Sequence, residues 1–205
     1  MRHAPALLLA AATLALAGCA TTTFNSTWRN PEAQPVQPEG RKIAAVVMTK
    51  NPTHRRSAED ALAREITKRG AVGIPSYTLL STENPADPEV AQKELAARGV
   101  DGIVSMRVVS REQQETYVPG RWTTIENYRS FRGYWGYGWR QVYEPGYLQT
   151  DTIVSVETLV YSVRQDRLLW AGMSETINPA RADALVQELA GRVAGEMKKE
   201  GLLPK

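Results

Sequence analysis

The sequence predicts an α/β (α+β) fold with one mixed sheet of about five strands, three helices and a long antiparallel hairpin in its second half. Two observations predict this class. In the first half, short apolar runs rich in β-branched residues alternate with helical segments, as in layered α/β folds. In the second half, two long β-rich runs flank a tight turn, as in a hairpin. Residues 41–205 are long enough for a single α/β domain with its own core.

Residues 1–18 have the pattern of a lipoprotein signal peptide. Arg2 and His3 give a short basic start, and the apolar run that follows is too short for a comfortable membrane span. The run ends in LAGC at residues 16–19, which resembles the lipobox of bacterial lipoproteins. The alternative is an ordinary signal peptide whose cleavage site happens to precede a cysteine.

The lipobox resemblance implies that Cys19 carries fatty acyl chains such as palmitate and becomes the first residue of the mature chain. Cys19 is the only cysteine, so no disulfide can form within the chain. One acyl chain binds a membrane marginally, at about 0.8 kcal/mol per buried methylene, so several chains on one cysteine would anchor firmly. Ala20 follows Cys19, and the absence of Asp there favours the outer membrane over the inner one in proteobacterial lipoproteins. We therefore expect a lipid-anchored protein on the periplasmic face of the outer membrane.

Charge excludes a general nucleic-acid binder. The chain has 25 Lys and Arg against 22 Asp and Glu, a formal charge of +3, which falls to +2 when Arg2 leaves with the signal peptide. A balance so near neutral gives no basic footprint for nucleic acid. The membrane would be reached through lipid rather than through charge.

Residues 19–40 are interpreted as the lipidated cysteine and a flexible tether. The stretch TTTFNSTWRNPEAQPVQPEG after Cys19 is rich in Thr, Asn and Pro and shows no clear periodicity. Such a tether would span about 25 Å as a coil and about 65 Å as extended polyproline. The domain would then sit close to the membrane without being fixed against it.

The first half of the domain is predicted to be a strand followed by two helix–strand units. The run IAAVVM at 43–48 reads as a buried strand. Ser57 and Asp60 resemble a capping box for a helix over 58–70 that ends at Gly70. A second helix opens at the Asp-Pro-Glu sequence of 87–89, with proline at its first position, and ends at Gly99.

Both helices end in the same sequence pattern, R-G-x-x-G-I-x-S, at residues 69–76 and 98–105. Glycine after a helix supplies a left-handed turn, and the apolar residues that follow lead into a sheet. The repeated pattern therefore predicts the same helix-to-strand turn twice, which favours a layered α/β arrangement.

The second half is predicted to contain three strands and a helix. Residues 103–109 form a strand that continues towards Tyr117, and residues 150–163 and 168–176 form a hairpin around a turn at 165–166. Asn178 and Pro179 are expected to cap the last helix. Its apolar stripe predicts a face packed on the sheet, and it consists of Leu185, Leu189, Val193 and Met197.

The resulting order is β-α-β-α-β, an aromatic insert, β-β and α. This order is similar to the periplasmic α/β domain at the amino-terminal end of TolB and in the curli-secretion lipoprotein. The passage TLVYSVRQDRLLWAGMSET followed by a helix also resembles uncharacterised bacterial outer-membrane lipoproteins. The resemblance covers residues 41–111 and 148–203 and implies the fold more than an activity.

Residues for catalysis are scarce. His3 and His54 are the only histidines, and the sequence has no G-x-S-x-G, P-loop or G-x-G-x-x-G motif. One histidine outside the signal peptide and a lipidated cysteine give no metal cluster of recognisable spacing. We therefore expect no enzyme, no catalytic residues, no cofactor and no metal.

The strongest small-site pattern is a basic segment between the first strand and the first helix. Loops at the carboxyl ends of strands and free N–H groups at helix starts favour anions. A solvated basic loop is the alternative. The candidate anion-binding residues are Lys50, His54, Arg55 and Arg56.

The insert at 117–147 holds 10 of the chain's 15 aromatic residues, together with four arginines, two glutamates and no lysine. Tyr, Trp and Arg are enriched at binding hot spots. The candidate partner-binding residues are Trp122, Tyr134, Trp135, Tyr137, Trp139, Arg140 and Tyr143.

Three interpretations of this insert stay open. It could bind an envelope protein or cell-wall partner, or it could contact the membrane or form a homo-oligomer, by analogy with the curli-secretion lipoprotein. Its polar and apolar residues do not alternate cleanly over the ten or so residues that a spanning strand needs. It could also be structural, with flanks that extend the hairpin and bury rings in the core. The sequence thus predicts a non-enzymatic binding or assembly factor of the envelope, with a subunit of an oligomeric envelope channel or transport assembly as the alternative.

Overall fold

A computed structural model describes residues 21–32, 40–81, 88–122, 130–132, 135 and 143–203. The strands are β1 (Thr21–Arg29), β2 (Lys42–Met48), β3 (Val72–Pro75), β4 (Val100–Val118), β5 (Arg121–Trp122), β6 (Tyr143–Glu144), β7 (Tyr147–Ser162) and β8 (Arg167–Ile177). The helices of the described part are α1 (Pro52–Thr67), the 3-10 helix η1 (Ser76–Thr78), α2 (Pro88–Ala97) and α4 (Ala182–Lys199).

The main sheet is mixed, which confirms the predicted class. Its six strands lie in the order β1-β8-β7-β4-β2-β3, and β5 pairs with β6 in a small second sheet. β2 is parallel to β3 and β4, while β4, β7, β8 and β1 pair antiparallel. The predicted hairpin is present as β7–β8, and Asp166 in its turn has a left-handed φ of 46°. α1 and α2 connect the parallel strands in the way that such crossovers require.

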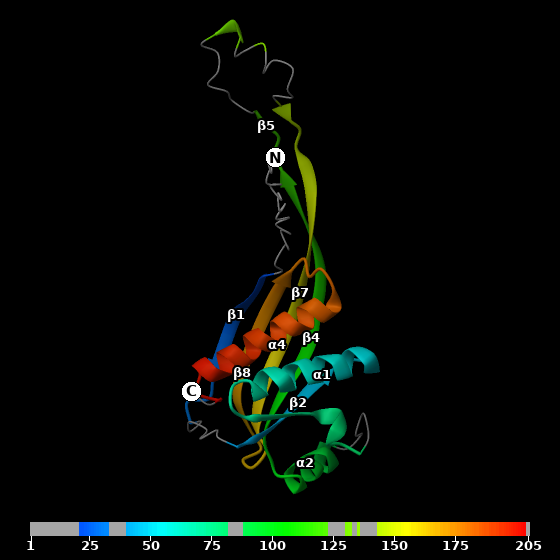
Figure 1. Cartoon of the computed structure of the whole chain (residues 1–205), viewed down its shortest axis with the longest axis vertical. Coiled ribbons are helices and arrows are strands. Elements are labelled where there is room, and N and C mark those ends of the chain that lie inside the picture. The colour runs from blue at the N-terminus through cyan, green and yellow to red at the C-terminus, as the bar shows by residue number, and fades with distance from the viewer. Residues whose placement is uncertain are drawn as a thin grey trace, which may run out of the picture.

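Helices α1 and α4 lie on one face of the sheet and enclose the larger core (Figure 1). The predicted stripe of α4 is confirmed, because Leu189, Val193 and Met197 are buried in this core. Trp170 of β8 is its largest fully buried side chain. A Cβ on Gly172 would lie 2.2 Å from the Trp170 ring, so only glycine fits beside the indole. α2 packs a smaller cluster against the other face, at the end of the sheet away from β5.

The expected tether over 19–40 is wrong for Thr21–Arg29, which form the edge strand β1. β1 pairs with β8 along its length, and Phe24 packs edge-on against Trp170 with ring centroids 5.8 Å apart. Thr, Phe and Trp favour strands because their side chains suit a half-buried pleated surface. The alternation was hidden because a register shift between Phe24 and Ser26 reverses the faces of the strand. The rest of the expected tether lies largely outside the described residues.

Two helix starts also differ from the expectation. α1 begins at Pro52, and Asn51 caps it by accepting a hydrogen bond from His54 N at 3.0 Å, so Ser57 lies inside the helix. Asn before Pro provides both an N-cap acceptor and a preset first turn. α4 begins at Ala182 rather than directly after Asn178 and Pro179. Three of the four candidate anion-binding residues, His54, Arg55 and Arg56, are thus part of α1, and Lys50 lies before it.

The repeated helix-to-strand turns are confirmed. Gly70 and Gly99 have φ values of 89° and 72°, the left-handed conformation that glycine adopts without steric cost. The second glycine of the pattern at residues 69–76 has a packing role, because a Cβ on Gly73 would lie 2.2 Å from Ala63 O of α1. This close approach explains why α1 sits tightly on the β3 edge.

Candidate functional site

β4 and β7 continue well beyond the body of the sheet (Figure 1). The last β8 pair on β7 joins Ile177 to Ile153, and past this rung β4 and β7 pair only with each other among the described residues. The register is unchanged at Val118 opposite Tyr147 and again at Trp122 opposite Tyr143. β5 and β6 therefore extend the same ladder. We call the arm the two-stranded segment of residues 113–122 and 143–152.

The arm is interrupted at matching positions on its two strands. Pro119-Gly120 faces Pro145-Gly146, and the prolines lack the N–H needed for ladder hydrogen bonds. A Cβ on Gly120 would lie 2.9 Å from Gly146 N, and one on Gly146 would lie 2.3 Å from the Tyr117 hydroxyl. The glycines thus let the backbones and the Tyr117 ring approach closely. In sequence, both Pro-Gly pairs read as turns, which hid the continuity of the arm.

Asn178 holds the base of the arm. Its backbone N donates to Thr152 O at 2.8 Å, and its side-chain Oδ1 accepts from Thr152 N at 2.8 Å. Its Nδ2 donates to Asp151 Oδ1 at 2.7 Å. The left-handed φ of 49° that brings this amide back onto β7 is tolerated by Asn. The residue expected to cap the last helix instead ties the end of β8 to the arm.

Asp151 is the charged part of this junction. The amides of Gln149 and then Asn178 donate to its carboxylate and lower the pKa of Asp151. A lowered folded-state pKa contributes stability that is present above the unfolded-state pKa and is lost as pH falls through the folded-state pKa. The junction is therefore complete at neutral pH.

The arm changes character along its length. All eight residues of its first four rungs are polar, and we call this part the shaft: residues 113–116 and 149–152. We call residues 117–122 and 143–148, beyond the shaft, the tip. Here Trp122 packs on Tyr143 with ring centroids 4.7 Å apart and the ring planes tilted by 44°. Its large side chains have exposed fractions of 64% for Tyr117, 72% for Trp122, 59% for Tyr147 and 65% for Leu148. A polar stalk thus presents an aromatic end to its surroundings.

The tip carries one close ion pair. Arg121 Nε donates to Glu144 Oε2 at 2.5 Å across the β5–β6 rung. The pairing raises the pKa of Arg121 and lowers the pKa of Glu144. Both side chains are exposed, so the pair sets local register rather than adding much stability.

The predicted partner-binding residues divide into two groups. Trp122, Trp135 and Tyr143 are exposed in the structure, and Trp135 contacts Phe131 with ring centroids 5.4 Å apart. The remaining four, Tyr134, Tyr137, Trp139 and Arg140, lie outside the described residues. The flanks of the insert do extend the sheet, but they extend the pairing of β4 with β7 and not the predicted β7–β8 hairpin. The structural interpretation is therefore correct only in part. It is wrong in that the described rings of the insert are not buried in the core.

The predicted anion site does not assemble around a common point. Arg55 is buried and turns towards Glu59, with its Nε 2.9 Å from Glu59 Oε1. Arg56 lies over the Tyr77 ring at 5.6 Å. Neighbouring residues of a helix point in different directions, so the two arginines diverge. Lys50 and His54 lie on the exposed surface, before and within the first turn of α1.

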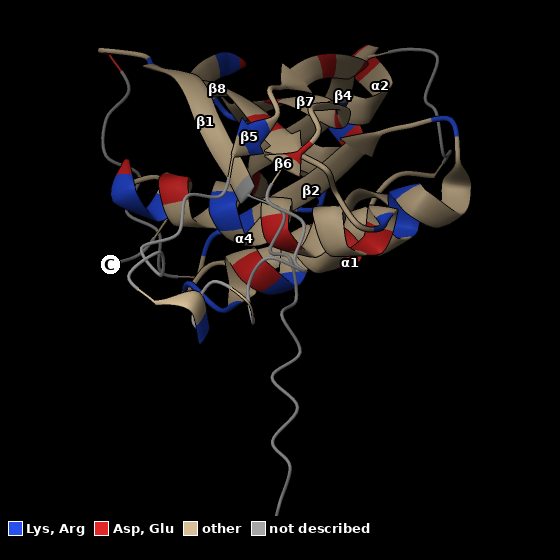
Figure 2. Ribbon diagram, turned by 90° about the horizontal axis from the view of Figure 1, so that it is seen from above, with Lys and Arg blue, Asp and Glu red and all other residues tan. Residues whose placement is uncertain are grey.

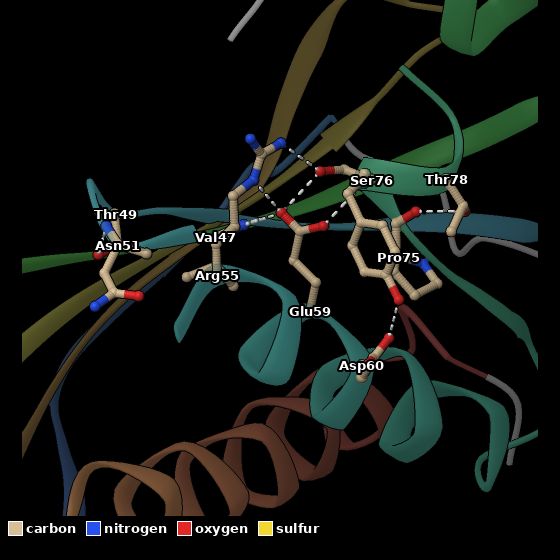
Figure 3. Close-up of polar contacts among 10 residues, drawn as sticks. Val47, Thr49, Asn51, Arg55, Glu59, Asp60, Pro75, Ser76 and Thr78 are labelled. Carbon is tan, nitrogen blue, oxygen red and sulfur yellow. Dashed lines mark hydrogen bonds and ion pairs between the residues drawn. The ribbon is translucent and has the colours of Figure 1, made fainter. Parts of the chain in front are cut away.

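Sequence reasoning missed the role of Glu59, which is fully buried. Its Oε1 accepts hydrogen bonds from Val47 N at 3.1 Å and Ser76 Oγ at 2.8 Å, besides that from Arg55, and its Oε2 accepts from Tyr77 N at 3.0 Å (Figure 3). One carboxylate thereby joins α1 to β2 and to η1. The only local signal was the i,i+4 spacing of an arginine and a glutamate, which is also common on exposed helices.

A groove of about 830 Å³ lies between the end of β2, α2 and the uncovered faces of β4 and β7. Its walls include apolar Val46, Leu95 and Leu159. Among its charged side chains, Arg107 Nη2 donates to Glu157 at 2.8 Å. Most of the lining residues are apolar, and the groove was not foreseen from the sequence.

The described residues contain no group of three or more His, Cys, Asp or Glu side chains arranged to hold a metal ion. None of the helices in this part of the chain is both long and apolar enough to cross a bilayer. Basic and acidic residues are interspersed over α1 and α4 (Figure 2), as expected for a chain of net charge +3.

No family model matches the sequence, and no curated protein matches it. Among solved structures, the chain is similar to a PelC dodecamer from Paraburkholderia phytofirmans, with 13% identity and a TM-score of 0.47 over 84% of this chain and 94% of that chain. A variant PelC dodecamer from the same organism has 15% identity and a TM-score of 0.45 over 85% of this chain and 95% of that chain. Lipoprotein GNA1162 from Neisseria meningitidis has 14% identity and a TM-score of 0.41 over 78% of this chain and 99% of that chain. These similarities are too distant to transfer an activity or an assembly, and the likeness to TolB and the curli-secretion lipoprotein stays a resemblance in element order.

We expect Glu59→Ala to lower the free energy of unfolding by about 3–5 kcal/mol, because it removes the buried carboxylate that pairs with Arg55 and accepts hydrogen bonds from Val47 N and Tyr77 N. Urea denaturation of the mature protein in detergent measures this loss. The matched control is Glu89→Ala, which breaks an exposed pair with Lys93 and should cost less than about 1 kcal/mol. Equal losses for the two variants would contradict the role assigned to Glu59.

We expect Asn178→Gly to loosen the arm while leaving the body folded. Glycine keeps the left-handed backbone but removes two side-chain hydrogen bonds, each worth about 1 kcal/mol. Amide hydrogen exchange should accelerate by about fivefold or more at Thr152 and along the arm. Asn30→Ala, which removes an amide that donates to Leu168 O at the opposite end of the sheet, should leave arm exchange unchanged. Unaltered exchange in Asn178→Gly would show that the ladder alone holds the arm.

Proposed function

We propose that this chain is a lipid-anchored, non-enzymatic protein of the bacterial envelope, on the periplasmic face of the outer membrane, and that it binds through its arm. The observation that carries the proposal is an exposed two-stranded arm with an aromatic tip. The LAGC sequence at residues 16–19 supports the anchor. The scarcity of histidine and the absence of catalytic motifs in the sequence support a binding role.

The arm has no evident task within the body. The core under α1 and α4 is closed by the sheet without it. An isolated two-stranded hairpin is at best marginally stable in water, so its extension into solvent is a cost unless something contacts it. Tyr and Trp combine large contact area with a polar group, which makes them effective binding residues. The tip concentrates these residues where the body cannot cover them.

Photo-crosslinking in living cells tests whether the arm binds anything. A photoreactive residue at Trp122 should give a discrete adduct, and the same residue at Gln187, on the exposed side of α4, should not. The absence of any adduct specific to position 122, whether to protein or to lipid, would overturn the proposal. Adducts from both positions would indicate a contact that is not a property of the arm.

A second candidate is a subunit of an oligomeric envelope channel or transport assembly. It is favoured by β1, a nine-residue strand at the edge of the main sheet. The outer backbone groups of an edge strand can pair with a strand from another copy. Light scattering of the lipidated protein in detergent separates the two candidates, because a ring or larger closed assembly supports the channel. A stable monomer opposes it.

A further inference from the structure

The start of β1 and the base of the arm lie at the same end of the sheet. Thr21 pairs with Ile177 of β8, and Ile177 pairs with Ile153 of β7. The next rungs of β7 belong to the arm. Only two strand spacings of about 4.8 Å separate β1 from β7, so Thr21 lies near the arm base. β1 then runs away from the arm.

The anchor is short and the arm is long. Cys19 precedes Thr21 by two residues, which span at most about 7 Å. The arm runs for nine residue steps from Gln113 to Trp122, or about 30 Å at about 3.3 Å per residue. A lipid on Cys19 would therefore hold the arm base close to the bilayer surface. The arm is long enough for its tip to reach that surface as well.

The chemistry of the arm decides how it meets the bilayer. The shaft is polar on both faces, with Gln113 and Glu115 on one side and Gln114 and Thr116 on the other. Such a ribbon is excluded from hydrocarbon, where charges and unpaired polar groups are costly. The tip has the amphipathic rings that concentrate at headgroup level in membrane proteins. A polar stalk and an aromatic end thus fit a surface orientation and not a spanning one.

We propose that the arm lies along the membrane that the lipid anchor occupies, with the rings of the tip in its headgroup interface. This inference deepens the proposed function and rests on its anchor at Cys19, since it names the bilayer as what the tip binds. The protein is then held at two points, the lipid and the tip. Because β5 and β6 keep the register of the β4–β7 ladder that joins the tip to the body, this contact would orient the whole sheet on the membrane.

An environment-sensitive dye reports the surroundings of the tip. Lipidation blocks the thiol of Cys19, the only cysteine, so a cysteine introduced elsewhere is the single labelling site. NBD is attached to Trp122→Cys or Tyr147→Cys at the tip, and to Lys93→Cys or Gln187→Cys on exposed positions of α2 and α4. The lipidated variants are reconstituted into phosphatidylethanolamine–phosphatidylglycerol vesicles with or without spin-labelled lipid. Matching circular dichroism spectra confirm that each variant is folded.

The inference expects a blue-shifted emission and quenching by spin-labelled lipid at both tip positions, and neither effect at the α2 and α4 positions. If NBD at the tip of vesicle-bound protein emits as it does in water, the tip does not contact the membrane. That result would overturn the inference without contradicting the lipid anchor. A blue shift without lipid quenching would also overturn it, in favour of a protein surface such as a second copy. Dye uptake by the chain without an added cysteine would show a free Cys19 thiol, and would overturn the anchor and the inference together.

Discussion

One antiparallel ladder between β4 and β7 underlies both the core and the arm. It runs from Gly102 opposite Ser162 to Val118 opposite Tyr147, with a single register shift between Val108 and Ser110, and β5–β6 continue it. In the body, β2 and β8 flank this ladder, α1 and α4 cover one face, and α2 packs on part of the other. Beyond their ends, the same two strands have no flanking strand among the described residues. The body therefore acts as the rigid base on which an otherwise marginal hairpin can extend.

The arm leaves the body at one end of the sheet, where two other features also lie. β1 starts there, close to Cys19 in sequence, and Asn178 ties β8 to β7 at the same level. The polar shaft then separates the body from the aromatic tip. In the proposed arrangement, with Cys19 lipidated, a contact at the tip would orient the body rather than only tether it.

The basic residues at the start of α1 have a structural role instead. Its most buried cation, Arg55, is balanced by Glu59, whose carboxylate also satisfies backbone N–H groups of β2 and η1. A buried charge must find such partners to be tolerated. The cluster therefore stabilises the junction of α1 with the parallel strands and is not free to receive an external anion. This leaves the arm as the part of the described surface with the most evident binding chemistry.

Local patterns were sufficient for the features whose partners are near in sequence: the hairpin around Asp166, the left-handed turns at Gly70 and Gly99, and the apolar stripe of α4. Tertiary structure decided the rest. A bulge reverses the faces of β1, and paired Pro-Gly steps interrupt the arm, so neither shows a regular period. The partners of Glu59 and the alignment of β1 with the arm depend on segments far apart in the chain. Periodicity reports which face a residue takes, whereas only the register between distant strands determines which residues meet.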